Sequence, residues 1–507
     1  MVLQSIDPLA CGSSSFDRDS CGAAGLAPLQ RRDLFLEALR RTEPLIRLAE
    51  QHHVSRKFIY QQMEKATAAI DQAFQPAGPQ DNHVLFQLPV TQEWLEQLVL
   101  SLTLICHSSY RGVMELLETL FDYHRISLGS IHNLLMRAVD KARQFHRMED
   151  LSAIQVGAHD EIYQARQPVL VGMDVVSTYC YLLEAVDHCD ETTWGVHLLE
   201  LEDRGLHLDY TIADAGTALR AGQRAAWGDL PCHGDVFHTE KSLHELCTFL
   251  GHRACACTAA RQKIQHKYEQ IERACKRQTL GRRFAQAQRE EHKALTVAAD
   301  VRVLTEWMEQ DVLAVAGPPL ADREELYDFL ITELGRYQDD CPHRIGPLVR
   351  MLRNQRTALL AFVEVLQENL SAVAQRFAVP VATVQALCEI EALDPRSDLY
   401  WQRTARWQTL LKERWYPIRQ AVLEAMAHTP RASSLVENLN SRLRNYFFLR
   451  RQIGHGYLDL LRFFVNHRRF PRSDRPERVG KSPAELLTGR THPHWLELLG
   501  YTRFHRN

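Results

Sequence analysis

The stretch QVGAHDEIYQARQPVLVGMDVVSTYCYLLEA, residues 155–185, decides the fold of this chain because it contains three apolar runs of strand-like character. Its apolar residues either alternate with polar ones or run continuously, and polar, Gly or Pro residues separate the runs. Similar runs follow in WGVHLLEL (194–201), LHLDYTIAD (206–214) and CHGDVFH (232–238). We therefore predict a mixed sheet of about five strands in this part of the chain.

The composition is that of an ordinary globular protein. The chain has 507 residues, 45% of them hydrophobic and 24% charged, which is enough for roughly two to four domains. No apolar run approaches the roughly 20 residues that span a bilayer, and the first residues lack the pattern of a secretory signal. The twelve cysteines have no regular spacing, which is typical of a reducing compartment. We expect a cytoplasmic protein with no membrane partner.

A segment near the N-terminus, PLIRLAEQHHVSRKFIYQQMEKATAAI (44–70), has the plan of a helix-turn-helix. His53 stands at the expected turn, and Ser55 can cap the second helix. Two short packed helices that do not touch DNA would have the same plan, but DNA binding is favoured because the next segment repeats the theme. The expected packing positions are Ala49, Val54 and Ile59, and the side chains offered to a major groove are Arg56, Lys57 and Gln61.

A second helical segment, residues 85–150, repeats this plan, with Ser127 or Ser130 as a cap. Tandem units would let one chain follow two adjacent stretches of duplex. A third such stretch, residues 370–390, is more consistent with a plain helical hairpin. The basic side chains that we expect to be exposed on the second unit are Arg137, Lys141 and Arg143.

Positive charge is concentrated locally, although the net charge of the whole chain is only −3. One basic tract lies at residues 261–293 and a second at residues 442–481. Such tracts suit contacts with phosphate groups, and solvated helix faces are the alternative interpretation.

Three carboxylates fall where strands end or a helix begins. Asp160 lies in the first predicted strand, Asp214 ends a later one, and Glu437 lies in RASSLVENLNSRLRNYFFLRR (431–451), a predicted amphipathic helix. An Asp at a strand end is usually a turn or cap residue. Carboxylates on separate elements that converge are, however, what two Mg²⁺ ions about 3.5–4 Å apart require. The helix also carries a polar stripe formed by Glu437, Asn440, Ser441 and Arg444.

Together these blocks resemble bacterial insertion-sequence transposases of the DDE type. HDEIY…PVLVGMDVVSTYCYLLEA is similar to the first hairpin of their catalytic core, and GLHLDYTIADAGTALRAG to the block around the second acid. DVFHTEKSL is similar to the Asp-x-x-His element of Mutator-like groups, and SSLVENLNSRLRNYFFLRRQ to the final Glu helix. The resemblance is close over residues 155–245 and 430–490.

The resemblance implies a metal-binding triad of Asp160, Asp214 and Glu437, with two Mg²⁺ ions that Mn²⁺ can replace. Asp174, also at a strand position, remains an alternative first acid. The other residues implied are supporting groups, Asp174, Asp235, His238, Asn440 and Arg444, and a path for the DNA ends, Arg450, Arg451, Arg468 and Arg469. A purely structural role in helix packing is the alternative for Asp235 and His238.

The expected fold class is α+β and mostly helical, with an RNase H-like mixed sheet interrupted by a long all-α insertion. The expected activity is metal-dependent cleavage and strand transfer of double-stranded DNA, at terminal inverted repeats and target sites, by a homo-oligomer that is at least a dimer. The alternatives are a domesticated or inactive transposase that only binds DNA, and a nuclease that cuts without joining. The expected domains are a disordered tail (1–28), a helix-turn-helix (29–75), a second DNA-binding or oligomerisation unit (85–150), the catalytic core (151–245 with 430–490), the insertion (246–429) and a C-terminal tail (491–507).

Overall fold

The computed structural model describes residues 26–74, 88–431, 434–449 and 454–504. It divides into two compact units, Met1–Pro89 and Val90–Asn507. The protein is mostly helical, at 69%, and has a small mixed sheet of five strands, which confirms the coarse α+β class. Most of the predicted tail (1–28), together with Arg450 and Arg451, lies outside the described residues.

Within residues 26–74, the first unit has three helices, α1 (Pro28–Arg40), α2 (Leu45–Gln51) and α3 (Arg56–Phe74). His53 adopts a left-handed backbone with φ of 49°, so the turn lies where the sequence predicts it. The Ser55 hydroxyl accepts a hydrogen bond from the Phe58 N–H at 3.1 Å and caps α3 as expected. The small core of this unit is formed by Leu34, Ala38, Leu48, Ala49, Val54 and Ile59.

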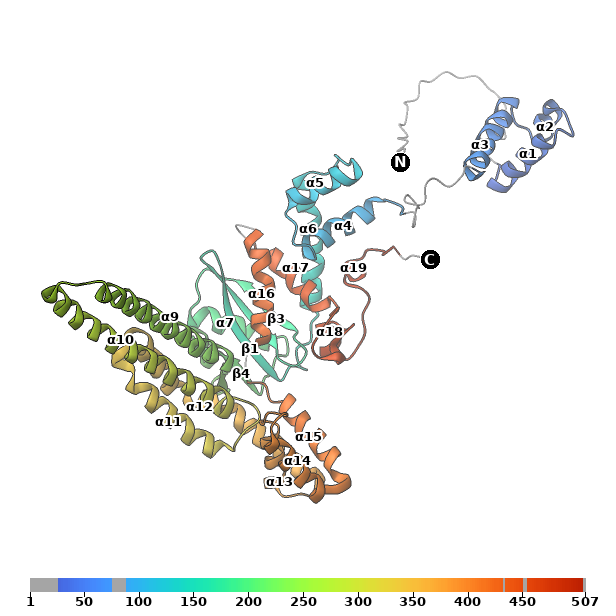
Figure 1. Cartoon of the computed structure of the whole chain (residues 1–507). Coiled ribbons are helices and arrows are strands. Elements are labelled where there is room, and N and C mark those ends of the chain that lie inside the picture. The colour runs from blue at the N-terminus through green and yellow to red at the C-terminus, as the bar shows by residue number, and fades with distance from the viewer. Residues whose placement is uncertain (1–25, 75–87, 432–433, 450–453, 505–507) are drawn as a thin grey trace. The chain divides into compact units, whose positions relative to one another are not determined.

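The second unit is built on the sheet, whose strand order is β3-β2-β1-β4-β5. The first three strands pair antiparallel, whereas β4 pairs parallel to β1 and β5 pairs parallel to β4. β1 therefore lies at the centre of the sheet, with β2 and β3 on one side and β4 and β5 on the other (Figure 1). The strands are β1 (Val156–Gln164), β2 (Gln167–Asp174), β3 (Cys180–Ala185), β4 (Tyr210–Ala213) and β5 (Cys232–Gly234).

One predicted strand is wrong, because WGVHLLEL lies in a helix, α7 (Glu191–Glu202). Its buried residues Trp194, Leu198 and Leu201 recur at helical spacing, and the Asp190 side chain caps its first turn. A short continuous apolar run does not distinguish a strand from a buried helix by periodicity. The next helix, α8 (Thr217–Trp227), packs closely against α7.

Helices from both ends of the second unit share one hydrophobic core with the sheet, and the 85–150 segment is therefore not packed separately from it. Of the basic side chains of that segment, Arg137 and Lys141 are exposed as the sequence predicts, whereas Arg143 is half-buried. Each also contacts the same unit, Arg137 through Glu96 at 3.0 Å. Arg143 pairs with Asp459 at 2.7 Å, and Lys141 donates to the Leu499 carbonyl. The helices that contribute to this core are α4 (Gln92–Leu104), α5 (Tyr110–Phe121), α6 (Leu128–Arg147), α16 (Ser434–Leu449) and α17 (His455–His467), of which α16 and α17 pack on the strands. The chain continues to η6 (Pro476–Arg478), α18 (Pro483–Thr488) and α19 (Trp495–Leu498).

The segment between β5 and α16 is helical, as the sequence predicts, and begins with a long pair formed by α9 and α10 (Figure 1). Gly234 of β5 lies directly against α12, since a Cβ at this position would lie 2.8 Å from Leu359 Cδ2. The elements are α9 (Val236–Glu269), α10 (Ala274–Trp307), η3 (Met308–Val312), α11 (Leu320–Arg336), η4 (Gln338–Asp340), α12 (Pro342–Phe377), α13 (Val381–Ile390), α14 (Asp398–Leu411), η5 (Lys412–Arg414) and α15 (Trp415–Ala427).

Among the described helices, α12 alone has the length and apolar composition that crossing a membrane requires. Its apolar window is 44% buried within the protein, and its side chains take part in two hydrophobic clusters of the insertion. α12 is therefore apolar because it is a core helix of the insertion.

Two helix glycines provide a matched test of the α7–α8 packing. A Cβ at Gly222 of α8 would meet Trp194 Cβ and lie 2.7 Å from the Glu191 carbonyl oxygen, whereas a Cβ at Gly251 of α9 would meet no atom within 4 Å. We expect Gly222→Ala to destabilise the protein by about 1–3 kcal/mol through overpacking. Gly251→Ala should stabilise it by up to about 1 kcal/mol through helix propensity. Urea unfolding measures both, and equal stability of the two variants would contradict the close packing.

Candidate functional site

The strand register brings Asp160 and Asp214 to neighbouring positions in the sheet. His159 of β1 is the parallel partner of Ala213 of β4, and each of these residues is followed by one of the acids. Asp160 lies within β1 and is buried, whereas Asp214 follows the last residue of β4 and is half-buried. The two carboxylates thus belong to adjacent strands of the same sheet.

The third acid, Glu437, arrives on α16, which packs against β1 and β2. The buried side chain of Asn440, one turn further along this helix, donates from Nδ2 to Asp160 Oδ2 at 2.7 Å. Arg444 lies on the same face, with Nη2 3.6 Å from Glu437 Oε2. The polar stripe predicted from the sequence therefore faces the acids, while the apolar side chains of α16 hold it on the sheet, namely Val436, Leu439, Leu443, Tyr446 and Phe447.

His238 comes from the first turn of α9, directly after β5. Asp235 caps this helix by accepting from the Phe237 N–H at 2.9 Å, and its other oxygen accepts from His238 Nδ1 at 2.6 Å. His238 Nε2 in turn lies 3.3 Å from Glu437 Oε1. One candidate ligand atom from each of Asp160, His238 and Glu437 lies within 4.8 Å of the others.

The cluster combines crowded carboxylates with the positive charge of His238. Burial raises the pKa of Asp160 to about 6, and the negative charges of Glu437 and Asp214 add to this shift. The hydrogen bond to Asp235 and the charges of the nearby acids raise the pKa of His238 to about 9. In the metal-free protein at pH 7, His238 is therefore an imidazolium that partly neutralises the acids.

Asp214 is close enough for its charge to raise the pKa of both Asp160 and His238. Its Oδ1 accepts from the Gly216 N–H at 2.7 Å, and its backbone carbonyl accepts from Arg220 Nε at 2.8 Å. These bonds fix the position of the acid at the end of β4.

The residues fit a hard divalent cation. The carboxylates of Asp160 and Glu437 converge, Asp214 lies on the adjacent strand, and carboxylate oxygens are the ligands that Mg²⁺ prefers. Asn440 Oδ1 is also buried without a hydrogen-bond partner among the described residues, so a water held by a cation would satisfy it. A cation would take over the charge compensation that His238 provides in the metal-free protein.

Asp174 lies apart from this cluster. It pairs with Gly157 in the β1–β2 hairpin, three residues from Asp160, which is about 10 Å along a strand. Its carboxylate accepts from the Val176 N–H, from the Ser177 N–H at 2.7 Å and from the Ser177 hydroxyl. Asp174 thus organises the turn after β2, and the geometry groups Asp160 with Glu437.

The basic residues expected along a DNA path have different surroundings. The Arg469 guanidinium pairs with buried Glu485 at 2.6 Å, and that of Arg468 lies 5.5 Å from the centre of the Phe464 ring. Arg450 and Arg451 lie outside the described residues. The side chains proposed for a major groove are exposed on α3, in the other unit, and these are Arg56, Lys57 and Gln61.

Sequence reasoning missed Arg431, which precedes α16. Its carbonyl accepts from the Val236 N–H at 3.2 Å, and its Nη1 donates to Glu240 at 2.8 Å and to the Leu313 carbonyl at 2.7 Å. Arg431 thus fixes the chain entering α16 to the start of α9. These partners are 118 to 195 residues away in the sequence, so no local signal identifies them.

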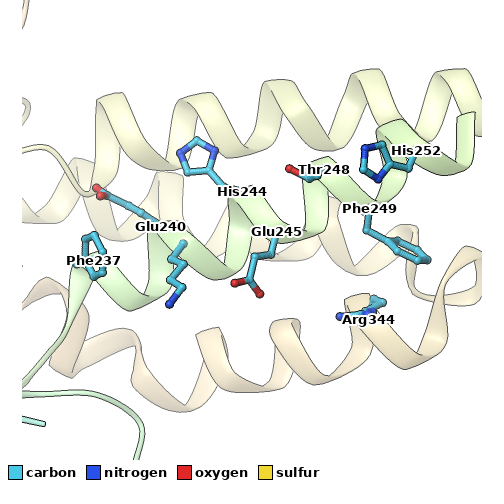
Figure 2. A pocket seen from close by; sticks show the side chains of 9 residues that line it. Phe237, Glu240, His244, Glu245, Thr248, Phe249, His252 and Arg344 are labelled. Atoms are coloured by element: carbon cyan, nitrogen blue, oxygen red, sulfur yellow. The ribbon is translucent and has the colours of Figure 1, made fainter. Parts of the chain in front are cut away.

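A cavity of about 730 Å³ lies along α9, and none of the three acids lines it. Figure 2 shows its side chains along α9, with Arg344 reaching in from α12. The Arg344 guanidinium lies 5.2 Å from the centre of the Phe249 ring, and His244 pairs with Glu309 at 2.8 Å. Its charges are mixed and partly paired, and the acid cluster is therefore the better candidate for chemistry.

No known protein family matches this chain, and no curated protein is significantly similar to it.

Asp160→Asn tests the charge crowding in metal-free protein. The raised pKa of Asp160 gives a stability contribution that is present below about pH 4 and lost as the pH rises through about 6. At pH 7.5 with EDTA, we therefore expect Asp160→Asn to be more stable than the wild type, by up to about 3 kcal/mol. Exposed Asp209→Asn, at the other end of β4, should change stability by less than about 0.5 kcal/mol. Added Mn²⁺ should raise the Tm of the wild type but not of Asp160→Asn, and lower stability of Asp160→Asn in EDTA would contradict the crowding.

Asp235→Asn tests the source of the His238 charge. The amide keeps an oxygen that can cap α9 but removes the negative charge beside Nδ1. We expect the pKa of His238 to fall from about 9 toward its ordinary value of 6.5, measured by NMR titration of the metal-free protein. An unchanged pKa of His238 would mean that the charge of Asp235 does not stabilise the protonated imidazole.

Proposed function

We propose that this protein is a DDE-type transposase that binds the terminal inverted repeats of a DNA element, cleaves phosphodiester bonds and joins the freed 3′-hydroxyls to target DNA. The observation that carries the proposal is the convergence of Asp160, Glu437 and His238, with Asp214 on the adjacent strand. These groups come from four segments of the chain, and a packed fold brings them together.

The sheet supports the assignment of an RNase H-like core. The resemblance requires the first acid in a hairpin strand, the second acid on a neighbouring strand and the Glu on a helix against the sheet. β1, β4 and α16 meet each of these requirements. The all-α segment between β5 and α16 agrees with the expected insertion.

The chemistry consists of two displacements at phosphorus. In cleavage, a water oxygen bonds to phosphorus, the bond to the 3′ oxygen breaks, and that oxygen leaves as a hydroxyl. In joining, this hydroxyl bonds to a phosphorus of target DNA and displaces another 3′ oxygen. Neither displacement needs a covalent bond between protein and DNA.

The residues of the site have separate tasks. Asp160, Asp214 and Glu437 would hold two Mg²⁺ ions, which Mn²⁺ can replace and which supply Lewis-acid activation of water and of the leaving oxygen when bound. Asn440 orients the Asp160 carboxylate, and Asp235 orients His238. Release of the His238 proton would accompany cation binding, because the two positive charges compete for the same acids.

Recognition of the repeats falls to the first unit in this proposal. The exposed face of α3 offers Arg56, Lys57 and Gln61 to a major groove. Two element ends must be held at once, so the active form would be at least a dimer on DNA. The protein would work in the bacterial cytoplasm, associated with the nucleoid while bound to DNA.

Asp214→Asn and Glu437→Gln test the proposal on a duplex that carries the DNA flanking the gene. Both variants should lose 3′-end nicking and strand joining by 100-fold or more, because each removes a carboxylate charge from the cation site. Both should bind the duplex as the wild type does. Cleavage is measured on gels in Mg²⁺ and in Mn²⁺.

Asp209→Asn is the matched control, since it removes an exposed charge from the other end of β4. It should cleave like the wild type. Unchanged cleavage by Asp214→Asn would show that the site is wrongly assigned. Binding without cleavage by the wild type in either metal would instead favour a protein that retains only DNA binding.

A further inference from the structure

A second cavity, of about 440 Å³, lies on the opposite face of α16 from the acid cluster and is lined by four arginines. Asn438 and Arg442 of α16 form one wall, and β2 and its following turn contribute Met173 and Thr178. The segment after α17 supplies the remaining charged side chains, Arg472, Asp474, Arg475 and Arg478.

The charge of this cavity is largely uncompensated. Four arginines and one aspartate line it, which leaves a net charge of +3. None of the four arginines forms an ion pair within 4 Å with a carboxylate in the part of the chain that the structure describes. This distinguishes them from Arg143, Arg431 and Arg469, which are paired with acids. Unpaired guanidinium groups that converge on a cavity are typical of anion binding.

One of these arginines, Arg478, is buried, and a second, Arg442, is half-buried. Arg478 is buried and donates from Nη2 to the Val176 carbonyl at 2.8 Å, in the turn that Asp174 organises. Arg442 has its Nε buried without a hydrogen-bond partner among the described residues. Burial lowers the pKa of both guanidinium groups, and a neighbouring arginine adds to the shift in each. A buried donor without an acceptor costs free energy that an anion would recover.

We propose that this cavity is a binding site for a DNA backbone phosphate. The inference rests on the proposed function for the identity of the nucleic acid, but the anion chemistry comes from the cavity itself. Phosphate is favoured over carboxylate because the site offers several guanidinium forks to one anion with three or more accessible oxygens. Such a contact positions a strand without reading its sequence.

The cavity and the acid cluster share the helix α16. Arg442 follows Glu437 by five residues on α16, or about 7.5 Å along the helix axis. The two side chains leave α16 on different faces, so a strand held at the cavity would pass around this helix to reach the acids. The same helix would then carry a carboxylate for the reacting group and an arginine that fixes the flanking strand.

Arg472→Gln/Arg475→Gln tests the site, because both side chains are exposed and their loss does not threaten folding. The matched control is Arg403→Gln/Arg406→Gln on α14, which removes two exposed charges far from the cavity in sequence. Fluorescence anisotropy with the flanking duplex, from 50 to 200 mM salt, gives the affinity and its salt slope. We expect the cavity variant to bind at least about tenfold more weakly, with a slope smaller by about 1, and the control to match the wild type. Arg442→Gln should weaken binding in the same direction.

Several outcomes would overturn the inference. Equal affinity of the cavity variant and the wild type for the flanking duplex would show that the cavity binds no DNA phosphate. Binding of inorganic pyrophosphate that the cavity variant loses, with unchanged DNA affinity, would assign the cavity to a free phosphate compound. Tighter binding of duplex RNA of the same sequence would assign it to RNA.

Failure of this site and failure of the proposed function are distinguishable. If Glu437→Gln loses cleavage while the cavity variant binds DNA normally, the function stands and the phosphate site falls. If the cavity variant loses DNA affinity while the wild type cuts no DNA in either metal, the phosphate site stands and the transposase assignment falls.

Discussion

The hydrogen bond from Asn440 to Asp160 is the contact on which the rest of the site depends. It joins residues 280 apart in the sequence and links the central strand to the helix that carries Glu437, which the apolar side chains of α16 hold on the sheet. It is buried, so breaking it would leave Asp160 with an unmet acceptor where water does not compensate. Asp160 is thereby oriented and Glu437 is placed near it by the same bond.

The helical insertion is anchored to the sheet at both of its ends. At its start, Asp235 caps α9 and orients His238, and at its end Arg431 bonds to the first turns of the same helix. Between these points, α12 packs on β5 so closely that Gly234 leaves no room for a side chain. The insertion is therefore part of the framework that positions the acids.

Much of the framework follows from the sequence, because alternation and chain punctuation are local properties. The hairpin, the strands that carry the acids, the helical character of the insertion and the stripe on α16 could all be predicted in this way. The run around Trp194 could not be, because a short buried helix and a buried strand are equally apolar. Asp160 and Asp174 also stand in similar local patterns, and only the position of α16 separates them. The arrangement of His238 beside Glu437, and of Arg442 near Arg478, depends on tertiary packing between distant segments.

The distance in sequence between Asp160 and Asn440 also sets an order of events during synthesis. At about 5–20 residues per second, a ribosome needs roughly 15–55 s to make the 280 residues between them. During that time β1, β4 and the whole insertion can fold while Glu437 does not yet exist. The acid cluster is completed only when α16 leaves the ribosome, so its four segments do not meet until synthesis of the chain is nearly finished.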